Sequence, residues 1–145
     1  MSSSAFSRMA GLAFLAGALA TLVFHQGAVW TLYQTGLMPP GFEPWSLNPV
    51  PPLGVPTVLS KAFWGGLWAI LIAQLLAGRS GSGYWLGWVL LGAIALPVVA
   101  IFVVPPLKGM PIPAFTERFP LYALINAIWG FGAAVFLRLM HASPR

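Results

Sequence analysis

Few side chains in this sequence could do chemistry, and four of the polar ones fall within long apolar stretches. These four are His25, Gln26, Lys61 and Asn126. An imidazole, two amides and an ammonium group can bind a small anion or a polar head group through charge and hydrogen bonds. Polar groups are costly in apolar surroundings and often serve function there. We therefore predict a polar pocket formed by these four side chains.

Each of these residues also has a purely structural interpretation, which the sequence leaves open. Lys61 lies near the end of its apolar stretch, so its ammonium could snorkel to a membrane surface. Asn126 could form a hydrogen bond between helices. His25 could bond a backbone carbonyl. The pocket is therefore a hypothesis about how these residues meet in space.

Catalytic and metal chemistry find little support. The chain has no Cys and no Asp, and its only carboxylate side chains are Glu43 and Glu117. The glycines around Ser82 fit neither a nucleophile elbow nor a dinucleotide-binding loop. His25 and His141 fall at opposite ends of the predicted helices, so they should not share one haem iron. We expect no catalytic residue, no metal site, no cofactor and no enzymatic activity.

The composition indicates an integral membrane protein. The chain has 145 residues, of which 59% are hydrophobic and 6% are charged, whereas a soluble domain carries about 25% charged residues. The seven Lys and Arg residues give a net charge of +5, but they are scattered singly instead of forming one basic face. We therefore expect the lipid bilayer as a partner, and no nucleic acid.

Four stretches are long and apolar enough to cross a membrane. A bilayer core about 30 Å thick needs about 20 apolar residues in a helix, and unpaired backbone cannot face lipid. The predicted spans are residues 9–33, 57–77, 84–104 and 119–138. The predicted fold is thus an all-α membrane protein, a four-transmembrane-helix bundle with residues 1–145 as one domain. The first apolar run continues past a signal-peptide-like start, so we expect it to be a retained span.

Two proline-rich segments, 37–56 and 105–118, separate the predicted spans. Proline fixes φ and favours extended backbone, so we expect both segments to be non-helical. The first also contains apolar and aromatic residues, among them Trp45, which a solvated linker would not need. We predict that it is a stiff outer cap on the helix ends; the alternative is a disordered loop. Pro97, inside the third span, should kink that helix.

The basic residues indicate an orientation, because cytoplasmic flanks carry an excess of Lys and Arg. With the N-terminus inside, the cytoplasmic flanks carry Arg8, Arg79, Arg138 and Arg145, and the outer flanks carry Lys61, Lys108 and Arg118. We therefore expect both termini in the cytoplasm and both proline-rich segments outside.

Short matches between the two halves of the chain predict an internal repeat. Residues 17–20, 50–54 and 61–65 match residues 92–95, 104–109 and 126–130 in the same order. Such halves would form two parallel two-helix repeats; chance matching among common residues is the alternative. Small residues at four-residue spacing should bring the helices together. They fit a monomer, a homo-oligomer or assembly with another membrane subunit equally well.

Three motifs carry a resemblance to a known group of proteins. They are Phe24-His25-Gln26-Gly27, Val50-Pro-Pro-Leu-Gly54 and Lys61-Ala-Phe-Trp-Gly-Gly66. With these motifs the chain resembles uncharacterised small bacterial inner-membrane proteins. The resemblance implies a four-helix inner-membrane fold and a bacterial source, and it implies no activity and no site residues.

The leading prediction is a multi-pass protein of the bacterial inner (plasma) membrane without catalytic activity. It would be a structural or accessory component, or a binder of a small ligand. The alternative is a small oligomeric transporter or channel, for which Pro97 and the repeat are the support. A continuous polar path reaching Gln74 would favour transport, whereas a closed outer pocket would favour binding.

Overall fold

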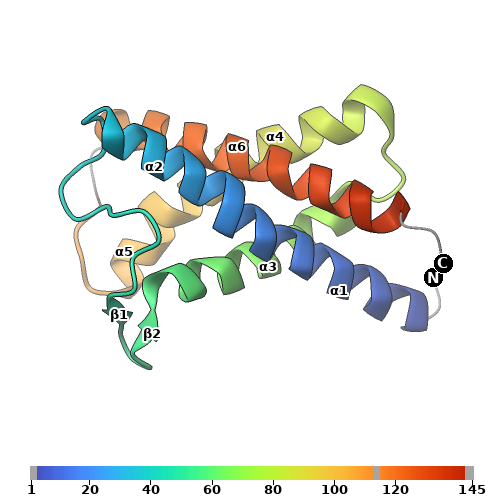
Figure 1. Cartoon of the computed structure of the whole chain (residues 1–145), viewed down its shortest axis with the longest axis horizontal. Coiled ribbons are helices and arrows are strands. Elements are labelled where there is room, and N and C mark those ends of the chain that lie inside the picture. The colour runs from blue at the N-terminus through green and yellow to red at the C-terminus, as the bar shows by residue number, and fades with distance from the viewer. Residues whose placement is uncertain (1–2, 113–114, 143–145) are drawn as a thin grey trace.

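The computed structural model describes residues 3–112 and 115–142, and its long helices lie side by side (Figure 1). Within these residues, four helical stretches are long and apolar enough to span a membrane. They are Ser4–Gln34, Thr57–Leu75, Gly81–Leu107 and Arg118–His141. The predicted all-α class with four transmembrane helices is therefore confirmed.

The first span is one helical path made of α1 (Ser3–Ala20), η1 (Thr21–His25) and α2 (Gln26–Gln34). It begins before the predicted residue 9, because the polar residues that precede the apolar run also adopt helix. The element η1 is a π-helical turn, in which the N–H of Gln26 donates to the carbonyl of Thr21. Such turns carry an extra residue and often occur at functional sites.

The segment 37–56, here called the cap, follows α2 and leads to α3 (Thr57–Leu75). It ends in a small antiparallel hairpin of β1 (Pro49–Val50) and β2 (Val55–Pro56). In Figure 1 the cap lies at the left, opposite the two chain termini. These two ends of the molecule are called the cap end and the terminal end below.

The third span joins α4 (Gly81–Val98), η2 (Val99–Val103) and α5 (Val104–Leu107). Pro97 lies near the end of α4, and the second π-helical turn follows it at once. The span continues past the predicted end at 104, because Pro105 and Pro106 occupy the first turn of α5. In a first turn the missing proline N–H has no helical partner to lose.

The last span is α6 (Phe115–Ala142), which contains Pro120 near its start. Helix therefore covers both ends of the segment 105–118, which we had expected to be a loop throughout. The described connection between α5 and α6 is correspondingly shorter than predicted. Pro120 is the sixth residue of α6, so it lies inside the helix and cannot donate the usual hydrogen bond to the carbonyl four residues before it.

The helices pack in the order α3, α1, α6, α4, while α3 and α4 make little contact despite the short turn that joins them. Glycine allows the closest approaches. A Cβ on Gly17 would collide with the carbonyl of Gly65 on α3, and a Cβ on Gly92 would lie 2.5 Å from the carbonyl of Asn126 on α6. Small residues thus bring the backbones together, as expected for helices in lipid.

These glycine contacts join matched positions of the proposed repeat. Gly17 and Gly92 are equivalent in the sequence alignment of the halves, and they meet the equivalent stretches 61–65 and 126–130. The contacts between the halves are not equivalent, because α1 packs on α6 whereas α4 does not pack on α3 in the same way. The duplication therefore stays a prediction.

The surface is as apolar as the core. Alanines and two indoles fill the centre, where Trp88 and Trp129 are almost wholly buried. Large apolar side chains such as Leu15, Leu71 and Leu90 point outward and are about half exposed. An apolar surface of this extent would be a liability in water, and it suits a lipid environment.

Candidate functional site

Two of the four predicted pocket residues lie on facing turns of η1 and α3. A Cβ on Gly65 would collide with the hydroxyl of Thr21, so these two residues touch. His25 and Lys61 lie one turn closer to the cap end on the same two helices. The structure thus brings His25 and Lys61 together.

Gln26 links this pair to the cap. Its side chain is 1% exposed, and its Nε2 lies 3.3 Å from His25 Nδ1. Its Oε1 accepts a 2.7 Å hydrogen bond from the backbone N–H of Trp45. One amide therefore uses both of its ends, one on the imidazole and one on the cap segment.

A second hydrogen bond holds the cap, and it depends on the π-helical turn. The N–H of Gln26 donates to the carbonyls of Thr21 and Val23, which leaves out the carbonyl of Leu22, its usual partner in an α-helix. The indole Nε1–H of Trp45 donates to this Leu22 carbonyl at 2.9 Å. The irregular turn thus creates the acceptor that the cap uses.

Trp45 itself has an unusual backbone, with φ at +46°. A bulky residue in this left-handed region is strained by about 1–2 kcal/mol. Its hydrogen bonds to Gln26 and Leu22 hold it there. The sequence indicated that Trp45 belongs to a cap on the helix ends, but nothing in it revealed these two partners.

The cap also contacts α3 and α6. The carbonyl of Asn48 accepts hydrogen bonds from the N–H and the hydroxyl of Thr57, at 2.9 Å and 2.7 Å. The Phe42 ring lies 6.2 Å from the ring of Tyr122, between centroids, and the Arg118 guanidinium lies 5.8 Å from the Phe42 centroid. The cap is therefore fixed to the first, second and fourth spans.

Asn126 takes no part in the cluster of His25, Gln26 and Lys61. Its Nδ2 donates to the carbonyl of Tyr122 in its own helix at 2.8 Å. No hydrogen bond between described residues connects it with the other three predicted pocket residues. Of the four residues predicted to form the pocket, the structure therefore brings together three: His25, Gln26 and Lys61.

The cluster carries the positive charge of Lys61, and none of the described side chains beside it is acidic. Lys61 forms no ion pair with a described side chain, and Glu43 of the cap is exposed. Among the described residues, no three His, Asp or Glu side chains come together as a metal site would require. The available chemistry is hydrogen-bond donation and positive charge under a covering segment.

Comparisons with protein-family models, with curated proteins and with solved structures found no match for this chain. The functional argument therefore depends on the geometry of the described residues.

Proposed function

We propose that this chain is a non-catalytic, multi-pass protein of the bacterial inner membrane that binds a small anion beneath its cap. The observation that carries the proposal is that Lys61 and His25 lie on facing turns, one turn from the contact of Thr21 with Gly65, without an acidic partner among the described side chains. An unpaired charge within a membrane span is costly. A bound carboxylate or phosphate would compensate it and accept hydrogen bonds from both groups.

The fixed position of the cap supports binding over transport. Between Lys61 and Gln74, no residue of α3 carries a charged, hydroxyl or amide side chain. Gln74 has a buried Nε2 without a hydrogen-bond partner among the described residues. The small oligomeric transporter or channel, the alternative, would need a polar path at this position, which α3 does not supply.

Small anions should stabilise the purified protein through Lys61. Sodium phosphate or sodium acetate, compared with sodium chloride at equal ionic strength, is expected to raise the melting temperature in detergent. A ligand at 100 times its Kd stabilises a protein by about 2.7 kcal/mol when it binds only the folded state. Lys61→Gln should abolish this increase, because it removes the positive charge that binds the anion.

Lys108→Gln is the matched control, since it removes the same charge from an exposed position at the same end. It should keep the full response to both anions. Equal responses of wild type, Lys61→Gln and Lys108→Gln would reject the anion site.

The orientation of the protein can be tested at the two ends of the molecule. We propose that the terminal end faces the cytoplasm and the cap end faces outward, from the distribution of Arg residues. In spheroplasts, a membrane-impermeant maleimide should label Ser46→Cys in the cap and should not label Ser4→Cys in α1. The reverse pattern would contradict this orientation.

A further inference from the structure

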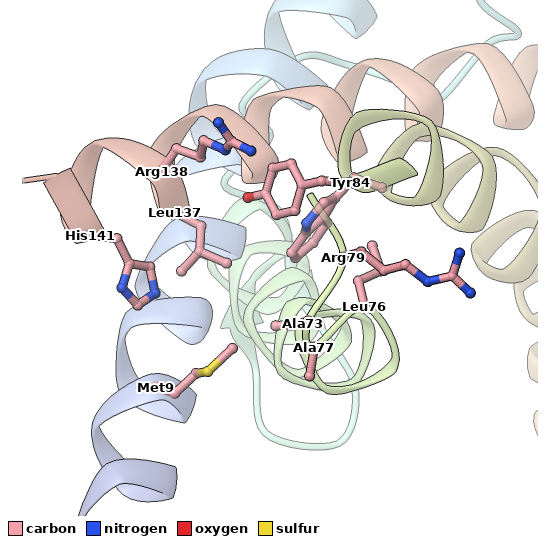
Figure 2. A pocket seen from close by; sticks show the side chains of 11 residues that line it. Met9, Ala73, Leu76, Ala77, Arg79, Tyr84, Leu137, Arg138 and His141 are labelled. Atoms are coloured by element: carbon pink, nitrogen blue, oxygen red, sulfur yellow. The ribbon is translucent and has the colours of Figure 1, made fainter. Parts of the chain in front are cut away.

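A separate cavity lies at the terminal end, far from the cap, where the four spans converge (Figure 2). Its volume is about 430 Å³. Met9 of α1, Ala73 of α3 and Leu137 of α6 supply apolar walls.

The cavity also contains a buried donor without an acceptor. Trp88 is 0% exposed and lines the cavity, and its Nε1–H has no hydrogen-bond partner among the described residues. The neighbouring Tyr84 hydroxyl donates to the carbonyl of Ala134 at 3.0 Å. A buried N–H group without an acceptor is costly, and an oxygen of a bound molecule would supply one.

Basic side chains lie at the rim. The Arg138 guanidinium lies 4.7 Å from the Tyr84 ring centroid and 5.4 Å from that of Trp85. Figure 2 shows His141 on the same helix, one turn away, while the guanidinium of Arg79 extends to the other side. Stacking on aromatic faces orients Arg138 beside Tyr84 and Trp85. No described acidic residue pairs with these groups.

We propose that this cavity binds an anionic phospholipid from the adjacent leaflet, with its phosphate at Arg138 and His141 and the start of an acyl chain along Met9 and Leu137. Basic pockets between transmembrane helices recognise anionic lipid head groups in this way. A free phosphate ion would leave the apolar side chains of the cavity without a contact, whereas an acyl chain would pack against them. Trp88 would donate to a phosphate or ester oxygen.

Lipid selectivity in native mass spectrometry tests the proposal. The detergent-purified protein, mixed with equal amounts of phosphatidylglycerol and phosphatidylcholine, should retain phosphatidylglycerol preferentially. Arg138→Gln should reduce the affinity about tenfold, as expected for the loss of a charge-assisted hydrogen bond. Trp88→Phe should also weaken binding, because it keeps an aromatic ring and removes the N–H group.

Two controls separate this site from general charge effects and from the cap-end cluster. Lys108→Gln removes one exposed charge and should leave lipid retention unchanged, and so should Lys61→Gln. The lipid result is therefore independent of the anion site proposed at the cap end. Melting temperatures of all variants show whether each is folded, and Arg138, whose side chain is exposed, should tolerate substitution.

Three results would overturn the proposal. The first is equal retention of the two lipids, and the second is equal retention by wild type and Arg138→Gln. The third is displacement of bound phosphatidylglycerol by inorganic phosphate at low millimolar concentration, which would identify a site for a free anion. Preferential retention that is lost in both Arg138→Gln and Trp88→Phe would support it.

Discussion

Gly65→Leu is expected to destabilise the protein by about 1–3 kcal/mol or more, which is typical of overpacking in a closely packed core. A Cβ at this position would collide with the hydroxyl of Thr21, and it would lie 3.1 Å from the Gly17 carbonyl and 3.2 Å from Trp129 Nε1. Two of these atoms already share a hydrogen bond, since Trp129 donates to the Gly17 carbonyl at 3.1 Å. The variant should therefore separate the first, second and fourth spans and lower the melting temperature in detergent.

Gly11→Leu is the matched control, because a Cβ on Gly11, in the same membrane span as Gly17, meets nothing within 4 Å. It should leave stability unchanged or raise it slightly, since leucine favours helix over glycine by about 1 kcal/mol. Gly17→Ala adds a second case: its single methyl group would meet the Gly65 backbone. If Gly65→Leu and Gly11→Leu melted at the same temperature, the packing of α1 on α3 would be wrong.

The sequence allowed the spans and their packed faces to be predicted, but not the order of the helices. Apolar length determines how many helices can cross a bilayer, and small residues mark where backbones can approach. Gly17, Gly65 and Gly130 all lie at such contacts. The rows of small residues on the different helices are similar to one another, so several pairings of helices would bring them into contact equally well. The order α3, α1, α6, α4 follows from side-chain shapes that a ridge pattern does not contain.

Backbone irregularity was harder to predict than helix. Pro105 and Pro106 indicated a helix end, yet they lie in the first turn of α5, where a proline loses no helical hydrogen bond. The π-helical turn η1 leaves no local signal in Thr21–His25, where the residues are ordinary for a membrane helix. Its consequence, a Leu22 carbonyl available to Trp45, depends on contacts with a segment far away in the sequence.

The candidate sites show the same limit. Depth along a helix can be counted from the sequence, and it places His25 near Lys61. The direction in which a side chain points around the helix axis depends on packing. Asn126 therefore lies at the predicted depth but bonds within its own helix. The cavity at the terminal end was missed, because Arg138 was interpreted only as a topology signal. Tyr84 and Trp88, four residues apart and therefore on one helix face, were the available indication of a shared environment.

The cap should be released by the loss of one amide oxygen. Gln26→Leu keeps a similar shape but removes the acceptor for the Trp45 N–H, and an unsatisfied donor of this kind costs about 1–3 kcal/mol. Trp45 also has a strained φ of +46°. In Gln26→Leu its backbone N–H no longer forms the hydrogen bond that compensates for this strain. Both effects favour an open cap, while the spans keep their glycine contacts.

Hydrogen exchange of the detergent-purified protein measures this opening. The backbone amides of Trp45 and its neighbours in the cap should exchange about tenfold faster in Gln26→Leu, because 1.4 kcal/mol corresponds to a factor of ten. Trp45→Phe should have a related effect, since it removes the donor to the Leu22 carbonyl. Amides of α6 should exchange as in wild type.

Thr31→Val is the matched control on α2. It removes an exposed hydroxyl that donates to the Gly27 carbonyl at 3.0 Å within the helix, without touching the cap. Its cap amides should therefore exchange at the wild-type rate. Wild-type exchange in Gln26→Leu would mean that the remaining contacts, those of Trp45 with Leu22 and those of Asn48 and Phe42, hold the cap without the Gln26 amide. Faster exchange confined to the cap would establish the first span as its anchor, because the contacts on α3 and α6 are intact in that variant.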